Sequence, residues 1–190
     1  MEQTDTLEKL RELQVKYLME AEELFGPKTE CNFAGVMPGN VSSPKFCYAA
    51  VPYDRSKKAF MIIINLSNAE KNFKDGILQI SHEVVHMLSP EKDDNDKAVN
   101  YLEEGMATYF SKIITDRETS DQEFATSAIK GKEKYNEAFE LYLSLHEIDK
   151  DAVKKLRLVN PSLASLTALD FRQTDIKIEE EMIERLLRKF

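Results

Sequence analysis

Cysteine is scarce in this chain of 190 residues, which contains only Cys31 and Cys47. The two lie too far apart for a CxxC redox or zinc pair, so the common cysteine-based motifs of that kind are excluded. Because the sequence shows no export signal, we expect both thiols to be reduced and packed, with a disulfide between adjacent strands as the weaker alternative.

Long apolar runs are also missing. The longest candidate is the short segment FMIIINL at 60–66, far below the roughly 20 residues that span a bilayer. The amino-terminal segment MEQTDTLEKL has no basic run followed by an apolar one, so it does not resemble a signal or transit peptide. We therefore expect a soluble, cytoplasmic protein without a membrane partner.

Basic residues are outnumbered. The chain has 34 acidic and 26 basic side chains and a formal net charge of −8, which argues against a nucleic-acid partner because such binding neutralises phosphates. Repeats, low-complexity tracts and interdomain linkers are absent, and 42% of the residues are hydrophobic. The length and composition predict a single domain over 1–190 with one core.

The pattern of apolar residues and turn formers predicts the order of the elements. An amphipathic helix is expected over 5–25, with Asp5 as its cap and Gly26-Pro27 as its stop. Three β-branched or aromatic runs then predict strands; they are CNFAGVM at 31–37, FCYAAVPY at 46–53 and AFMIIINL at 59–66.

Helical spacing dominates the rest of the chain. A capping box of Ser67 and Glu70 opens a helix that ends before Pro90. Further helices are expected at about 97–115, 121–147, 150–158 and 176–189. This order predicts an α+β fold with a small antiparallel sheet, in three parts: a helix and sheet over about 1–66, two helices over about 68–116, and a mostly helical half over about 120–190.

The stretch ISHEVVHMLSP at 80–90 places His82 and His86 four residues apart, with Glu83 between them. Side chains four apart on a helix lie one turn above another, which allows two imidazoles to point at one zinc ion. The alternative is that these residues bind no metal and only form the solvated face of an amphipathic helix.

A zinc site needs a third protein ligand, and the metzincin pattern HExxHxxGxxH is absent after His86. The candidates are His146 and two adjacent glutamates, Glu103 and Glu104. Glu104 shares a helix face with the small residues Ala107 and Ser111, which would allow another helix to approach, whereas Glu103 lies off that face. The face geometry favours Glu104.

Together, HEVVH at 82–86 and YLEEGMATYF at 101–110 resemble the gluzincin metallopeptidases. In that clan HExxH provides two zinc ligands and a general base, and a glutamate in an EGxA-type segment of the next helix provides the third ligand. Gly105 and Ala107 match the EGxA segment. The resemblance covers about residues 69–111 and implies a zincin-like fold with the sheet beside the HExxH helix.

Carried over by position, the resemblance implies that His82, His86 and Glu104 bind one zinc ion per chain. Glu83 would be the catalytic base that activates water for hydrolysis of a peptide or protein substrate. The run 59–66 would correspond to the clan's edge strand, which pairs with an extended peptide, or would be an internal strand. The oxyanion-stabilising group is left open among four residues: Tyr109, Tyr135, Tyr142 and His146.

The chain departs from the clan at two points. Some gluzincins have an acidic residue four positions after the ligand glutamate, where it orients a histidine, and here that position is Thr108. The chain is also too short for the large accessory domains of many members, so it would be a minimal version. The alternative hypotheses are a non-proteolytic zinc-binding regulatory domain, or a helical interaction protein with an accidental HExxH.

Overall fold

The computed structural model describes residues 2–39, 49–92 and 99–190. The predicted strand segment 46–48, Cys47 included, and the start of the predicted helix at 97 lie outside these ranges. The described elements, in chain order, are α1 Glu2–Phe25, β1 Phe33–Pro38, β2 Ala49–Ala50, β3 Tyr53–Asp54, β4 Ala59–Ile64, α2 Leu66–Lys71, α3 Phe73–His86, α4 Tyr101–Thr119, α5 Gln122–Lys130, α6 Glu133–Ile148, α7 Ala152–Val159, the 3-10 helix η1 Leu163–Ser165, α8 Ala168–Arg172 and α9 Glu180–Leu187.

The fold is α+β, as predicted, but the sheet is mixed rather than antiparallel. β4 pairs antiparallel with β2 and β3 on one side and parallel with β1 on the other. A tight turn, in which the Asp54 carboxylate accepts hydrogen bonds from Ser56, makes β3 and β4 antiparallel neighbours. Because β2 and β3 together fill one side of β4, β1 pairs along the other side. Its direction is parallel to that of β4.

β4 is therefore the central strand of the sheet. The expectation that 59–66 offers a free edge to an extended peptide is wrong, and the alternative of an internal strand is confirmed. Both of its flanks are hydrogen-bonded within the chain, and the side chains of Ile62 and Ile64 are completely buried. Ile62 and Ile64 share one face of the strand, whereas Met61 and Ile63 on the other face are partly buried, so the apolar run AFMIII alternates in burial although it does not alternate in hydrophobicity.

The helices begin and end at residues that differ from the prediction because asparagine and glycine interrupt the apolar periodicity. The helix expected from Ser67 to before Pro90 is divided at Asn72, whose extended backbone ends α2 and whose side chain caps α3 by accepting from the Lys74 N–H. α2 is capped by Asn65, not by Ser67. The helix expected over 121–147 is likewise divided into α5 and α6 at Gly131.

Smaller differences concern the two ends of the chain. α1 already begins at Glu2, so Asp5 lies inside the helix and is not its cap. The helix expected over 176–189 is shorter, and η1 and α8 were not predicted. Such short helices carry too few residues for an apolar periodicity to show in a sequence.

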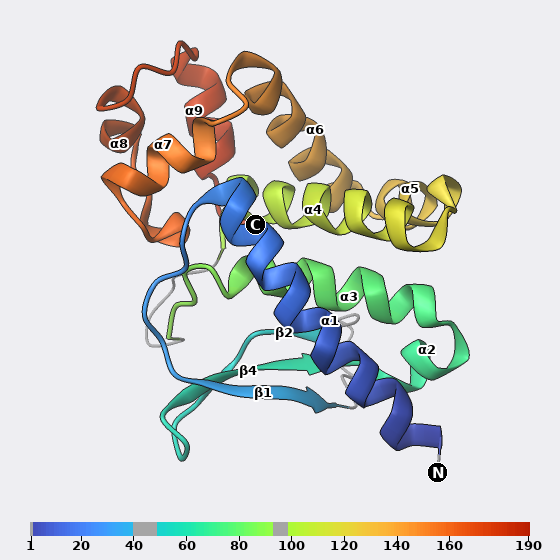
Figure 1. The fold of residues 1–190 in the computed structure, drawn as a ribbon. Coiled ribbons are helices and arrows are strands. Elements are labelled where there is room, and N and C mark those ends of the chain that lie inside the picture. The colour runs from blue at the N-terminus through green and yellow to red at the C-terminus, as the bar shows by residue number, and fades with distance from the viewer. Residues whose placement is uncertain (1, 40–48, 93–98) are drawn as a thin grey trace.

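The sheet, α3, α4 and α6 are stacked in that order, and α1 runs diagonally across α3 to contact β1 (Figure 1). α7, α8 and α9 gather beside the amino-terminal end of α4 (Figure 1). α4 is covered on more than one side, since all residues from Tyr101 to Thr108 are buried. This central position decides which of its side chains meet α3. In the described ranges, no helix is long and apolar enough to cross a membrane.

Close packing of α4 against α6 depends on Gly105. A Cβ atom at this position would lie 2.1 Å from the backbone oxygen of Ala138 in α6, a separation far inside van der Waals contact. The glycine that matches the EGxA segment in the sequence therefore serves helix packing.

Candidate metal centre

The two histidines of HEVVH lie one turn apart near the carboxyl end of α3. Their ring centroids are 5.1 Å apart, and the two Nε2 atoms are 3.3 Å apart. The polar face of this helix is not solvated, because Glu83 is only 6% exposed and Gln79 only 5%. Gln79 has a structural task there, since its Oε1 accepts a hydrogen bond from the Asn65 N–H. The alternative that HEVVH only forms the solvated face of an amphipathic helix is therefore wrong.

α4 lies against this face and brings Glu104 to the two histidines. Glu104 Oε2 is 3.2 Å from His82 Nε2, and Glu104 Oε1 is 3.8 Å from His86 Nε2. The structure thus brings together the three residues that were predicted as ligands, and each offers one ligand atom within 4.8 Å of the others. His146 is not part of this group. Within the described residues, no other set of His, Cys, Asp and Glu side chains converges in this way.

The spacing of these atoms fits a metal ion. Ligand atoms at about 2.0–2.2 Å from a tetrahedral ion lie roughly 3.3–3.6 Å from one another. The two Nε2 atoms are 3.3 Å apart, and the Glu104 carboxylate approaches His82 with Oε2 at 3.2 Å and His86 with Oε1 at 3.8 Å. Glu104 Oε2 is also buried without an aligned hydrogen-bond partner among the described residues. A buried carboxylate oxygen without a partner is costly, and a cation between the three side chains would satisfy it.

Glu103 contacts the other side of the His86 ring. Its Oε1 lies 2.8 Å from His86 Nδ1, and its side chain is only 4% exposed. Our sequence interpretation missed this contact, because it assigned Glu103 to a position off the Glu104 face. The signal was nevertheless present. The two nitrogens of an imidazole point to opposite sides of the ring, so adjacent residues about 100° apart on a helix can each reach one of them.

The buried charges of the cluster shift one another's pKa values. Burial raises the pKa of Glu83, and the nearby His86 and His82 offset only part of this effect. Burial would lower the pKa of His86, but the hydrogen bond to Glu103 and the charges of Glu104 and Glu103 outweigh it and raise the pKa to about 10. Burial would also raise the pKa of Glu104, yet the close His82 and His86 rings hold it below its usual range.

The four candidates for oxyanion stabilisation separate into two places. The Tyr135 ring in α6 lies 6.0 Å from the His82 ring. Tyr109, Tyr142 and His146 instead contact one another, with centroid distances of 5.0, 5.3 and 5.9 Å. Of the four candidates, Tyr135 is thus the one whose ring contacts a histidine of the predicted site.

Thr108 occupies the position where some gluzincins have an acidic residue. It is only 2% exposed, and its hydroxyl has no hydrogen-bond partner among the described residues. Thr108 therefore does not orient either histidine in this structure, and the contact to His86 is made by Glu103 instead.

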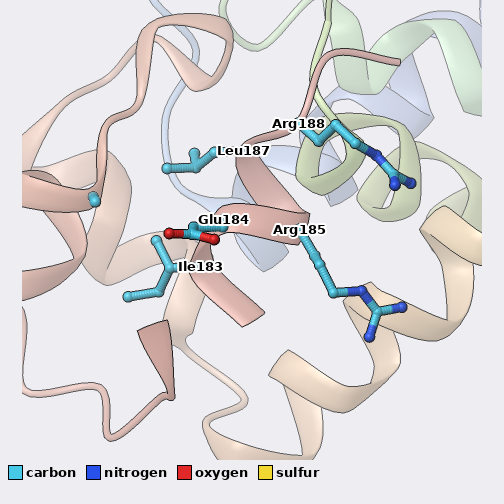
Figure 2. Close-up of a pocket in the computed structure, with 6 residues that line it drawn as sticks. Ile183, Glu184, Arg185, Leu187 and Arg188 are labelled. Carbon is cyan, nitrogen blue, oxygen red and sulfur yellow. The ribbon is translucent and has the colours of Figure 1, made fainter. Parts of the chain in front are cut away.

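A hollow on α9 shares no residue with this cluster. Ile183, Glu184 and Leu187 extend to one side of the helix, and Arg185 and Arg188 extend to the other (Figure 2). Arg188 forms an ion pair with Glu137 of α6 at 2.7 Å, so this side of α9 is occupied by contacts within the chain. The hollow offers no convergent set of ligand or catalytic side chains.

Comparison of the chain with protein-family profiles, curated protein sequences and solved structures finds no significant match to any of them. The residues of the metal centre therefore provide the basis for inferring a function.

Proposed function

We propose that this protein is a zinc-dependent peptidase of gluzincin type with a minimal zincin-like fold. The observation that carries the proposal is the convergence of His82, His86 and Glu104, from two neighbouring helices, at spacings that suit tetrahedral coordination. Two imidazoles and one carboxylate are a donor set typical of catalytic zinc, because three protein ligands leave one position open.

When bound, zinc would supply Lewis acidity and lower the pKa of water to about 7. Glu83 lies between the two histidines in α3, and its direction from the helix axis differs from theirs by roughly 60° to 100°. This direction suits Glu83 to take the proton of the attacking water and to pass it to the leaving amine. Burial raises the pKa of Glu83, which brings the carboxylate closer to the operating pH that an efficient base requires.

Tyr135 is the residue that we assign to stabilise the oxyanion by donating a hydrogen bond. Its ring lies beside His82, and it is also held against Phe190 with a centroid distance of 4.9 Å. Phe190 is fixed in turn by a backbone hydrogen bond from its N–H to the Val99 oxygen. A donor held by packing loses little freedom when substrate binds, which is what preorganised stabilisation requires.

The test is a Glu83→Gln variant assayed with a broad peptide library beside the wild type. Removing the base should reduce hydrolysis by at least about 100-fold, while metal content stays near one zinc per chain because His82, His86 and Glu104 are untouched. His86→Ala is the matched control, which should lose the metal as well as the activity. Hydrolysis that survives in Glu83→Gln would refute the role of this residue.

A non-proteolytic zinc-binding domain is the second candidate, and one observation favours it. β4 is paired on both sides, so the strand beside the HExxH helix offers no free edge for main-chain pairing with an extended peptide. This candidate predicts stoichiometric zinc in the purified wild type without turnover of any member of the peptide library.

A further inference from the structure

We propose that Glu103 is the positioning residue of the metal centre, holding the His86 ring so that Nε2 faces the ion. This inference depends on the proposed metal site of His82, His86 and Glu104, but it does not depend on peptidase activity. The observation behind it is the contact of 2.8 Å between Glu103 Oε1 and His86 Nδ1, the nitrogen on the far side of the ring from the cluster.

Glu103 and Glu104 have different roles because their carboxylate oxygens approach different nitrogens of the His86 ring. Glu104 approaches His86 at Nε2, the nitrogen that also faces His82, whereas Glu103 approaches it at Nδ1. Because Nδ1 donates its hydrogen to Glu103, the lone pair of Nε2 is left for the metal, and the tautomer and the ring orientation are fixed together. Glu103 is thus a partner of a ligand and not a ligand.

Glu103 is itself held in place through Asn100, which contacts the first residue of η1. Its backbone N–H donates a hydrogen bond of 2.9 Å to the Asn100 side-chain oxygen, which caps α4. The Asn100 amide group then donates to the Leu163 backbone oxygen at 2.7 Å. Since Asn100 is 1% exposed and the Glu103 side chain 4% exposed, this chain of contacts is shielded from water and can fix a ring direction.

Thr108 can be compared with Glu103 as a residue that could orient a histidine. If the residue four positions after Glu104 oriented a histidine in this chain, its side chain would make a hydrogen bond, but the Thr108 hydroxyl has no partner among the described residues. The same task is therefore carried out from the residue directly before the ligand glutamate. This arrangement needs no acidic side chain at position 108.

The experiment compares zinc affinity in wild type, Glu103→Ala, Glu103→Gln and Thr108→Val by competition with a chromophoric chelator. Loss of the partner of a metal-binding histidine typically costs about 10- to 100-fold in affinity, so Glu103→Ala should fall in this range. Glu103→Gln keeps a neutral acceptor oxygen and should recover part of the loss. Thr108→Val removes a hydroxyl without a partner and should bind zinc like the wild type.

A second measurement distinguishes positioning from simple structural support. In the zinc-bound wild type, nitrogen NMR of the histidine side chains should show His86 with a slowly exchanging Nδ1 proton and a metal-bound Nε2. Glu103→Ala should lose the protection of that proton. A purely structural Glu103 would lower the unfolding temperature and leave the affinity and the NMR signature unchanged.

The possible failures are distinguishable. Wild-type zinc affinity in Glu103→Ala would overturn the positioning role and leave the metal site intact. Absence of stoichiometric zinc in the wild type would overturn both proposals. If Glu103→Ala does not fold, the isosteric Glu103→Gln variant decides, since a positioning role predicts weaker zinc binding and faster exchange of the Nδ1 proton than in the wild type.

Discussion

At the scale of single residues, the metal cluster is a set of charges that the fold keeps out of water. Glu83, Glu103 and Glu104 are each at most 6% exposed, and they surround His82 and His86. Burying three carboxylates is unfavourable unless cations balance them. Burial would lower the pKa of His86, but the hydrogen bond to Glu103 and the nearby carboxylate charges raise it to about 10, so in the absence of metal the ring can supply one balancing positive charge.

This shift predicts how zinc binding depends on pH. Because the pKa of His86 lies at about 10 in the metal-free protein, His86 carries a proton at neutral pH that zinc has to displace. Displacing one proton makes the apparent affinity rise about tenfold per pH unit between pH 6 and 9. Chelator competition at several pH values measures this slope, and calorimetry in buffers of different ionisation enthalpy measures the released proton.

Glu103→Gln is the control for the pH effect. Removing the Glu103 charge removes a major cause of the raised pKa, so the proton should be lost at lower pH and the slope should flatten in the upper part of this range. An affinity that is independent of pH in the wild type would show that His86 is not protonated in the metal-free protein.

At the scale of elements, the centre depends on the distance between neighbouring helices. α4 contacts α3 through the metal cluster and α6 through Gly105. α6 carries Tyr135, the residue beside His82. A change in the packing of α4 against α6 therefore shifts two parts of the proposed active site relative to each other.

Gly105→Ala tests this dependence. The added Cβ atom would lie 2.1 Å from the Ala138 backbone oxygen, so the helices have to separate, and overpacking of this kind costs about 1–3 kcal/mol or more of the free energy of unfolding. Denaturant unfolding measures the loss. Gly131→Ala is the matched control, because the Cβ atom there would meet the Ser127 backbone oxygen at 3.3 Å and the Ala128 backbone oxygen at 3.9 Å, and the stability of this variant should change little.

At the scale of the whole molecule, Arg157 connects segments that are far apart in the sequence. Its guanidinium group donates hydrogen bonds to the backbone oxygens of Phe25, Gly26 and Pro27, at the end of α1, and of Leu88, two residues after His86. Arg157 is 7% exposed and makes no ion pair with the part of the chain that the structure describes, so these carbonyl groups are its main partners. One buried cation thus holds α7, the end of α1 and the end of α3 together.

Arg157→Met is expected to lower the free energy of unfolding by about 3 kcal/mol, because it leaves several buried carbonyl oxygens without donors. Thermal and denaturant unfolding of the zinc-free protein measure this loss. Arg185→Met is the control, since Arg185 is half exposed and its nearest contact to Glu137 is 3.9 Å; such surface pairs contribute roughly 0–1 kcal/mol. Equal losses in the two variants would contradict the connecting role of Arg157.

The spacing of side chains along the sequence was enough to predict the three candidate metal ligands that the structure brings together. His82 and His86 four apart, and Glu104 in a stripe with Ala107, are properties of a helix that hold whatever surrounds it. The sequence also predicted the α+β order of the elements, because apolar periodicity is local. The ends of the helices were less predictable, since single side-chain caps such as Asn65 and Asn72 compete with other polar residues nearby.

What the tertiary structure alone decided is which groups meet across elements. The packing of helices and strands determines the direction of β1 against β4 and the burial of both sides of α4. It also determines the contact of Glu103 with His86 and the position of Tyr135 beside His82. Local spacing determines on which face of a helix a residue lies, but not which neighbour covers that face. Glu103 shows the difference, because its position on α4 was evident from the sequence, whereas its partner became evident only when α3 was placed against α4.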